Sequence, residues 1–193
     1  MRQQLRQLSG DTAIYGITTV VQRLLSFLLT PFYTWHLTPY DFGIQTGVFA
    51  TIAFLMVLSN AGMEAAFFRY VASAEDEQQK RTVFWNAIAV NWLVAALLGG
   101  LMVALPSLSN SIFLFGLNPQ ELELVRYAGI IIFLDSASTV ALASLRMERR
   151  AKTFGAIRIA AIVVNVAVNI WLVAGLKMRV EGVFIAGIFQ SAT

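Results

Sequence analysis

Residues 15–33 read YGITTVVQRLLSFLLTPFY, a long apolar stretch that carries Arg23 at its middle. About 20 helical residues at a rise of about 1.5 Å each cover the roughly 30 Å hydrocarbon core of a bilayer, so this stretch is long enough to span a membrane. A central arginine costs an inserted helix about 2.5–3.5 kcal/mol on insertion scales. We therefore expect Arg23 to face protein or water and not lipid.

The polar residues of this stretch fall on one side of the expected helix. At about 100° per residue they occupy an arc of roughly 100°, and apolar side chains cover the opposite side. A polar stripe of this length favours the wall of a hydrated, substrate-facing cavity, and the alternative is a structural ion pair of Arg23 inside a helix bundle. The stripe consists of Tyr15, Thr19, Gln22, Arg23, Ser26, Thr30 and Tyr33.

The composition of the whole chain is that of a polytopic membrane protein. Of 193 residues, 58% are hydrophobic and 13% are charged, whereas soluble domains have about 25% charged residues. The net charge of +3 lies in the connections between apolar segments and forms no basic face, which excludes a nucleic-acid partner. The chain has no cysteine and one histidine, so we expect no metal site and no cofactor.

The apolar segments predict an all-α, polytopic transmembrane helix bundle with about five complete spans and the start of a sixth. Basic residues gather in alternate connections, so the positive-inside rule places the N-terminus in the cytoplasm. The last segment is too short to cross a bilayer, and the sequence therefore looks truncated. The expected parts are a cytoplasmic segment, 1–11, and a transmembrane bundle, 12–193, with spans at 12–35, 42–67, 83–105, 122–145, 154–176 and 180–193.

Polar residues from several spans are expected to meet at one depth. Arg23, Asn91 and Asp135 each lie about 15 Å from the cytoplasmic face, judged by the helical rise. This predicts a hydrated interior in which Arg23 binds an anion and Asp135 is its ion-pair partner or a proton-carrying carboxylate. The alternatives are a plain interhelical ion pair for Asp135 and helix-packing contacts for the asparagines. The residues assigned to the cavity are Arg23, Gln22, Ser26, Asn91, Asp135, Asn165 and Asn169.

Three residues are candidates for a role in gating or at the membrane interface. Pro31 lies in the last third of the first expected span and removes a backbone donor, so it is expected to kink that helix or end it early. Glu64 and Arg69 lie near the end of the second span and are expected to pair with each other. The glycines at 99–100 are expected to permit close approach of two helices.

Two motifs and a basic turn carry a resemblance to a known family. The motifs are residues 30–43, TPFYTWHLTPYDFG, which follow Arg23, and residues 62–70, GMEAAFFRY; the basic turn precedes the fifth span. Within the first motif, Thr38 or Asp41 is expected to cap the next helix. With these motifs the chain resembles, over nearly its whole length, the bacterial polysaccharide-biosynthesis flippases of the Wzx type. These flippases belong to the superfamily of multidrug, oligosaccharidyl-lipid and polysaccharide (MOP) exporters.

The resemblance implies about twelve to fourteen helices in two lobes around a central cavity, with transport by alternating access. The chain would supply most of the first lobe, and the missing C-terminal lobe would be its partner. The implied activity is not enzymatic: an undecaprenyl-diphosphate-linked oligosaccharide is moved across the bacterial inner membrane. Such flippases bind the diphosphate-sugar head group with cationic cavity residues. By its position in the sequence, Arg23 corresponds to one of these cationic residues.

Three other functions remain open at this stage. A drug/cation antiporter of the same superfamily would need acidic cation sites, whereas the cavity candidates here are led by an arginine. A membrane-embedded transferase acting on lipid carriers would need a carboxylate or histidine cluster at a membrane face. The run at residues 75–77 is the acidic cluster of the chain, and a solvated loop explains it. A structural membrane subunit without a substrate is the third alternative.

Overall fold

The computed structural model describes residues 2–60, 62–113, 115–148 and 150–193, and the side chains of residues 2–14, 22, 26 and 120 lie outside this description. Every regular element in these ranges is helical, which confirms the all-α prediction. The elements are α1 (Arg2–His36), α2 (Pro39–Asn60), α3 (Met63–Ala72), α4 (Glu77–Ala104), α5 (Pro106–Ile112), the 3-10 helix η1 (Pro119–Glu121), α6 (Leu122–Met147), α7 (Ala151–Asn169), the π-helix η2 (Ile170–Gly175) and α8 (Arg179–Ser191).

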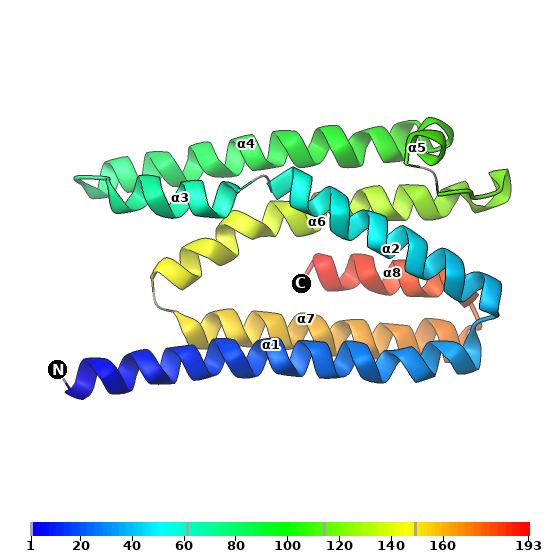
Figure 1. Cartoon of the computed structure of the whole chain (residues 1–193), viewed down its shortest axis with the longest axis horizontal. Helices are drawn as coiled ribbons and strands as arrows, with labels where there is room; N and C mark the ends of the chain where they lie inside the picture. Colours follow the sequence, from blue (N-terminus) through cyan, green and yellow to red (C-terminus); the bar gives the residue numbers. More distant parts are fainter. Residues whose placement is uncertain (1, 61, 114, 149) are drawn as a thin grey trace.

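The long helices lie side by side along the longest axis of the molecule, which is horizontal in Figure 1, and the chain alternates in direction from one to the next. α1 packs against α7, α8 packs against α7 and α6, and α4 packs most extensively against α6. We call the end that holds the N-terminus and the α3–α4 and α6–α7 connections the amino-terminal end. The far end holds the α1–α2 connection, α5, η1 and the connection between η2 and α8 (Figure 1).

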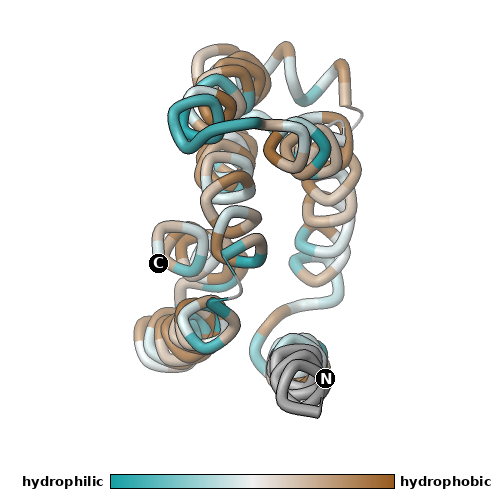
Figure 2. The backbone as a smooth tube through the Cα atoms, turned by 90° about the vertical axis from the view of Figure 1, so that its left-hand side faces the viewer, coloured by the Kyte–Doolittle hydropathy of each residue, from teal (hydrophilic) through white to brown (hydrophobic). Residues whose placement is uncertain are grey.

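Apolar side chains lie on the outside of this bundle as well as within it. Large exposed hydrophobic residues include Phe27 at 71%, Val57 at 72% and Leu97 at 66% exposure. Figure 2 looks along the axis and shows hydrophobic residues on the outer faces of several helices. Water would not stabilise so much outward apolar surface, whereas a bilayer does.

Four helical segments among the described residues are long and apolar enough to cross a membrane. They are Pro39–Ala72, Glu77–Ala104, Leu122–Met147 and Ala151–Gly175. The polytopic helical bundle is therefore confirmed, although the count is lower than the five complete spans expected. α1 is not among the four; its side chains at 2–14, 22 and 26 lie outside the description. A transmembrane α1 stays a prediction from the sequence.

The helix boundaries differ from the sequence expectation at three places. α1 already begins at Arg2, so the backbone of residues 2–11 is helical and continues into the first expected span; a cytoplasmic position of this segment stays a prediction. The second expected span is divided: α2 ends at Asn60, α3 begins at Met63, and Gly62 between them has a left-handed φ of 74°. The expected loop at 107–120 contains α5, which begins at Pro106 because proline cannot continue the hydrogen-bond ladder of α4.

Local sequence signals explain where the other helices begin. The side chain of Asp76 accepts a hydrogen bond of 2.6 Å from the backbone N–H of Gln79 and caps α4. Asn118 and Glu121 form a reciprocal capping box at η1, just before α6. These caps satisfy backbone donors at the bundle ends, where the helices meet the aqueous phase.

α4 and α6 cross at a pair of glycines. A Cβ built on Gly99 would lie 2.5 Å from the backbone oxygen of Gly129, and one built on Gly129 would lie 2.6 Å from the backbone oxygen of Gly99. Buried Met102 and Ala128 complete the contact, each at 0% exposure. The expected close approach at Gly99 is confirmed, because only a missing side chain permits this backbone separation.

Candidate functional site

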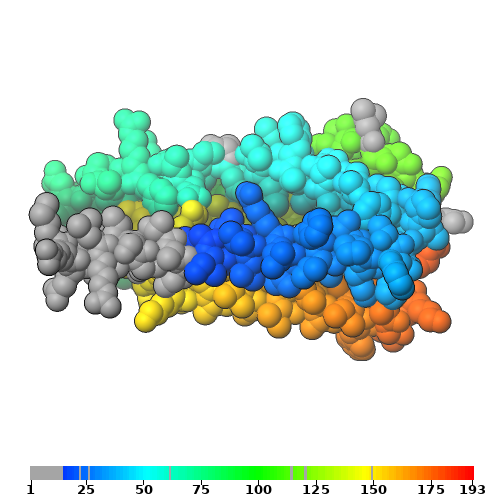
Figure 3. Space-filling model, turned by 60° about the horizontal axis from the view of Figure 1, so that its bottom comes forward, coloured from blue at the N-terminus to red at the C-terminus, as the bar shows by residue number. Residues whose placement is uncertain are grey.

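Arg23 lies on the surface of α1, among apolar side chains. Its side chain is exposed and makes no ion pair or hydrogen bond with any described residue. Leu24, Phe27 and Leu28 beside it are 55%, 71% and 54% exposed. Figure 3 shows that α1 lies at the molecular surface between α2 and α7. Lipid around this guanidinium would cost free energy, so water, protein or a ligand must cover this face in the membrane.

Two tyrosines of the polar stripe hold α1 against α7. The hydroxyl of Tyr33 donates a 3.0 Å hydrogen bond to Oδ1 of Asn169. Asn169 in turn donates to the backbone oxygen of Asn165 at 3.0 Å. Tyr15 meets the ring of Phe154 edge-on, with the ring centroids 5.2 Å apart. These contacts fix the rotation of α1 about its axis, and Arg23, about 80° around the helix from both tyrosines, is left exposed.

The polar stripe expected on α1 is therefore divided between two environments. Tyr33 is buried against α7, whereas Thr19 and Arg23 are exposed. The side chains of Gln22 and Ser26, which were also assigned to the cavity, lie outside the described residues. Arg23 is thus the charged member of the exposed part of the stripe.

Asp135 does not meet Arg23, although the two were expected at the same depth. Asp135 lies on α6 and lines a cavity of about 210 Å³ together with Arg158 of α7 and Ser191 of α8. Arg158 and Ser191 are thus polar neighbours of Asp135 in this cavity. The expected Arg23–Asp135 pair is not formed among the described residues. A shared depth along the axis does not put two helices side by side, and here α1 packs on α7 and not on α6.

Asn91 is enclosed between α4 and α6. It is 0% exposed, and its amide donates to the backbone oxygen of Ser136. The hydroxyl of Ser136 donates to Oγ of Ser59 on α2 at 2.9 Å. Asn169 is also 0% exposed. In this conformation both asparagines contact neighbouring helices, as the helix-packing interpretation requires, and neither lies beside Arg23.

Glu64 pairs with Arg146 and not with Arg69, which corrects the sequence expectation. Nη2 of Arg146 lies 2.8 Å from Oε2 of Glu64, so this pair joins α3 to α6. The guanidinium of Arg146 also stands 6.0 Å from the ring centroid of Phe68 and 5.6 Å from that of Phe154. Arg69 is exposed and forms no ion pair with a described residue, because the α3 surface that carries it points away from α6.

A proline inside α1 does not end the helix. α1 continues through Pro31 to His36, so the early end expected from the sequence is wrong. The hydroxyl of Thr34 donates to the backbone oxygen of Pro31 at 2.9 Å, and Nδ1 of His36 lies 2.9 Å from the backbone oxygen of Phe32. These contacts add local hydrogen bonds at the helix end. A gating role for Pro31 stays a prediction.

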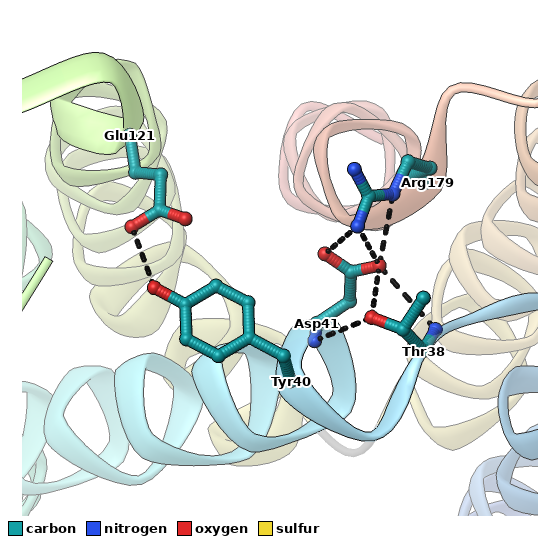
Figure 4. Close-up of polar contacts among 5 residues, drawn as sticks. All are labelled: Thr38, Tyr40, Asp41, Glu121 and Arg179. Atoms are coloured by element: carbon teal, nitrogen blue, oxygen red, sulfur yellow. Dashed lines mark hydrogen bonds and ion pairs between the residues drawn. The ribbon is translucent and has the colours of Figure 1, made fainter. Parts of the chain in front are cut away.

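Asp41 joins Thr38 and Arg179 at the far end, as Figure 4 shows. Nε of Arg179 donates to Oδ2 of Asp41 and Nη2 donates to Oδ1, both at 3.0 Å. The same carboxylate accepts the hydroxyl of Thr38 at 2.8 Å, and the backbone N–H of Asp41 donates back to that hydroxyl at 3.2 Å. Thr38 therefore caps α2, and the Asp41 carboxylate completes this capping box and binds Arg179 of α8 by a bidentate fork.

The sequence indicated the cap but not the ion pair. Lys177 and Arg179 have positive φ values of 53° and 47°, a conformation that costs a non-glycine residue roughly 1–2 kcal/mol. The bidentate contact with Asp41 offsets such a cost. Beside it, the hydroxyl of Tyr40 donates to Oε2 of Glu121 at 3.2 Å (Figure 4). Together these contacts tie the start of α2 to α6 and α8.

We predict that Asp41→Ala lowers the free energy of unfolding by about 2–4 kcal/mol, because a helix cap and a buried charge pair are lost together. Arg179→Ala should also lower it by about 2–4 kcal/mol, because it leaves the Asp41 carboxylate, whose side chain is 5% exposed, without its cation. Arg126→Ala is the control, because its pair with Glu123 is exposed on both sides; it should change stability by less than about 0.5 kcal/mol. Melting curves of the purified protein in detergent measure this order, and equal effects of all three variants would contradict it.

The apolar spans, the buried polar contacts between helices and the apolar outer surface define a polytopic helical membrane protein. Residues 8–192 match the model of a family described as polysaccharide biosynthesis protein, and the chain belongs to this family. The match is consistent with the Wzx-type resemblance and makes the chain a polysaccharide-related membrane transporter. No curated protein and no solved structure matches the chain in the corresponding comparisons.

Proposed function

We propose that the protein moves a lipid-linked oligosaccharide across the bacterial inner membrane, with an undecaprenyl diphosphate as the lipid carrier. It does so as a flippase and not as an enzyme, so the sugar and the diphosphate bond leave unchanged. The proposed orientation puts the amino-terminal end in the cytoplasm, because the short connections there carry most of the basic residues. Membership of the polysaccharide biosynthesis family supports the substrate class.

The exposed, unpaired Arg23 is the observation that carries this proposal. It lies on α1 about 30 Å from the first helical residue, judged by the rise of about 1.5 Å per residue, and no described acidic residue neutralises it. A cation left available within an apolar surface is costly unless it serves a ligand. A diphosphate is a suitable ligand because its oxygens match the fixed fork of guanidinium donors.

The rest of α1 presents a surface that suits such a substrate. Apolar residues flank Arg23 on its exposed side, with Ile17 at 61% and Val20 at 64% exposure. A polyprenyl chain contacts such residues favourably, whereas the diphosphate needs the cation. The hydrogen bond from Tyr33 to Asn169 and the contact between Tyr15 and Phe154 hold α1 against α7 on either side of Arg23 along the helix. The substrate-facing side of α1 is therefore oriented before the substrate binds.

A reconstitution assay tests the proposal. The full-length protein is inserted into vesicles that carry a labelled undecaprenyl-diphosphate oligosaccharide, and access of an added lectin to the sugar is followed over time. We expect the inner-leaflet fraction to become accessible within minutes, whereas protein-free vesicles keep it protected. An unchanged protected fraction would overturn the proposal. Mass spectrometry of the recovered lipid checks the non-enzymatic part, because an altered sugar or a cleaved diphosphate would support the transferase alternative.

A drug/cation antiporter is the second candidate, and the cavity around Asp135 is the observation that favours it. The carboxylate lies between α6, α7 and α8, in a cavity of about 210 Å³. Against a cation site, Arg158 lines the same cavity and already supplies a positive charge to Asp135. We therefore place this function second. Drug-driven proton or sodium exchange by the reconstituted protein, without any sugar-lipid transport, would reverse the order.

A further inference from the structure

A cavity of about 830 Å³ opens at the amino-terminal end between α3, α4 and α6, away from α1 and Arg23. Its floor is apolar: Phe67 is 4% exposed and packs, with Phe84 and Met147, on buried residues of α4 and α6. Its rim is polar and carries charges of both signs. The lining residues are Phe67, Val71, Ala72, Ala74, Glu77, Lys80, Arg81, Phe84, Ser144, Met147 and Glu148.

The cavity lies where three membrane spans end. The candidate span that includes α3 ends at Ala72, α4 begins at Glu77, and α6 ends at Met147. Two exposed aromatic residues lie near these helix ends, Tyr70 at 62% and Trp85 at 55% exposure. Tyrosine and tryptophan are enriched at the level of lipid headgroups. The apolar floor therefore faces the acyl region while the charged rim lies among the headgroups.

The charges on the rim leave one cation available. Nζ of Lys80 lies 2.6 Å from Oε1 of Glu77, and Glu148 lies 3.7 Å from a guanidinium nitrogen of Arg150. Arg81 is exposed and forms no ion pair or hydrogen bond with a described residue. It borders this cavity and also an adjoining hollow lined by Trp85. Because each acidic residue of the rim already has a cationic neighbour, Arg81 gives the mouth of the cavity an uncompensated positive charge.

We propose that this cavity binds an anionic phospholipid of the cytoplasmic leaflet. Its phosphate contacts Arg81, and an acyl chain lies against Phe67 and Phe84. Basic recesses between transmembrane helices on the cytoplasmic side bind lipid headgroups in this way. The amphipathic lining excludes a fully water-soluble anion, because the apolar floor would gain nothing from it. The site uses the orientation proposed above but does not depend on which substrate is transported.

Native mass spectrometry of the purified full-length protein with phosphatidylglycerol tests this site. We expect one phosphatidylglycerol to be retained in preference to phosphatidylcholine, and retention to fall as ionic strength rises. Arg81→Gln should weaken binding about fivefold, which corresponds to one basic residue near an anionic surface, whereas Lys80→Gln should weaken it less, because Glu77 already pairs with Lys80. Ala74→Trp should fill the cavity and weaken binding of both lipids. Arg81→Gln removes no contact with a described residue, so its melting temperature without lipid should match that of the unaltered protein.

Arg69→Gln is the matched control, because Arg69 is exposed near the same end, has no ion pair with a described residue and does not line the cavity. It should leave binding unchanged. Equal retention of phosphatidylcholine, or an equal loss in the Arg69 and Arg81 variants, would overturn the site in favour of general lipid adhesion. Displacement of phosphatidylglycerol by a lower concentration of undecaprenyl diphosphate would overturn the choice of a phospholipid and assign the cavity to the lipid carrier.

Discussion

Arg23→Ala is expected to abolish surface polysaccharide while the amount of protein in the membrane stays the same. Each charge-assisted hydrogen bond to a phosphate contributes about 1.5–3 kcal/mol, so loss of the guanidinium should lower transport at least about tenfold. The fold should persist, because Arg23 contacts no described polar partner. Complementation of a strain that lacks the gene measures the polysaccharide, and immunoblotting of membranes measures the protein.

Arg23→Lys separates charge from geometry. The ammonium keeps the positive charge but lacks the planar fork, so we expect partial activity. Arg126→Ala is a suitable control at the far end, because its ion pair is exposed and contributes little. Full activity of Arg23→Ala would refute the anion-binding role, and loss of the protein from the membrane would favour a structural role. If Asp135→Asn abolishes export while Arg23→Ala does not, the antiporter becomes the better interpretation.

The helical class and the position of most spans could be predicted because few backbone structures can span a bilayer. Backbone groups in hydrocarbon must be paired within the segment, so a long apolar run such as 122–145 predicts a helix; the structure forms α6 there. The exposed position of Arg23 could also be predicted in part. A cation among Leu24, Phe27 and Leu28 has to avoid lipid, although the sequence left open whether protein or water covers it.

The contacts between helices could not be predicted with the same success. Helical rise gives the depth of Asp135 but not its direction, so the actual neighbour, Arg158, was missed. Glu64 was assigned to the nearest basic residue along the chain, whereas packing of α3 on α6 brings it to Arg146. The partner of Asp41 is a turn near the end of the chain, and only the left-handed backbone at Arg179 directs that guanidinium toward it. Each of these contacts depends on the order of helices around the bundle, which hydropathy does not encode.

The sequence of α4 also does not tell which of its adjacent glycines, Gly99 or Gly100, faces a neighbouring helix. Substitution of each glycine tests this difference. A Cβ at Gly99 would lie 2.5 Å from the backbone oxygen of Gly129, whereas a Cβ at Gly100 meets nothing within 4 Å. Gly99→Ala must push α4 away from α6 and disturb the buried Asn91 and Met102. We expect it to lower the free energy of unfolding by about 2 kcal/mol or more, and Gly99→Val should prevent accumulation of folded protein.

Gly100→Ala is the matched control, since it adds the same methyl group to the next residue of the same helix. It should leave the α4–α6 contact intact and stabilise the helix by up to about 1 kcal/mol, because alanine loses less backbone freedom than glycine. Thermal denaturation of both variants in the same detergent measures the difference. Equal melting temperatures would mean that α4 and α6 separate at no cost, and the crossing at Gly99 and Gly129 would then not hold the bundle together. Opposite shifts would show that the contact depends on the single face of α4 that meets α6.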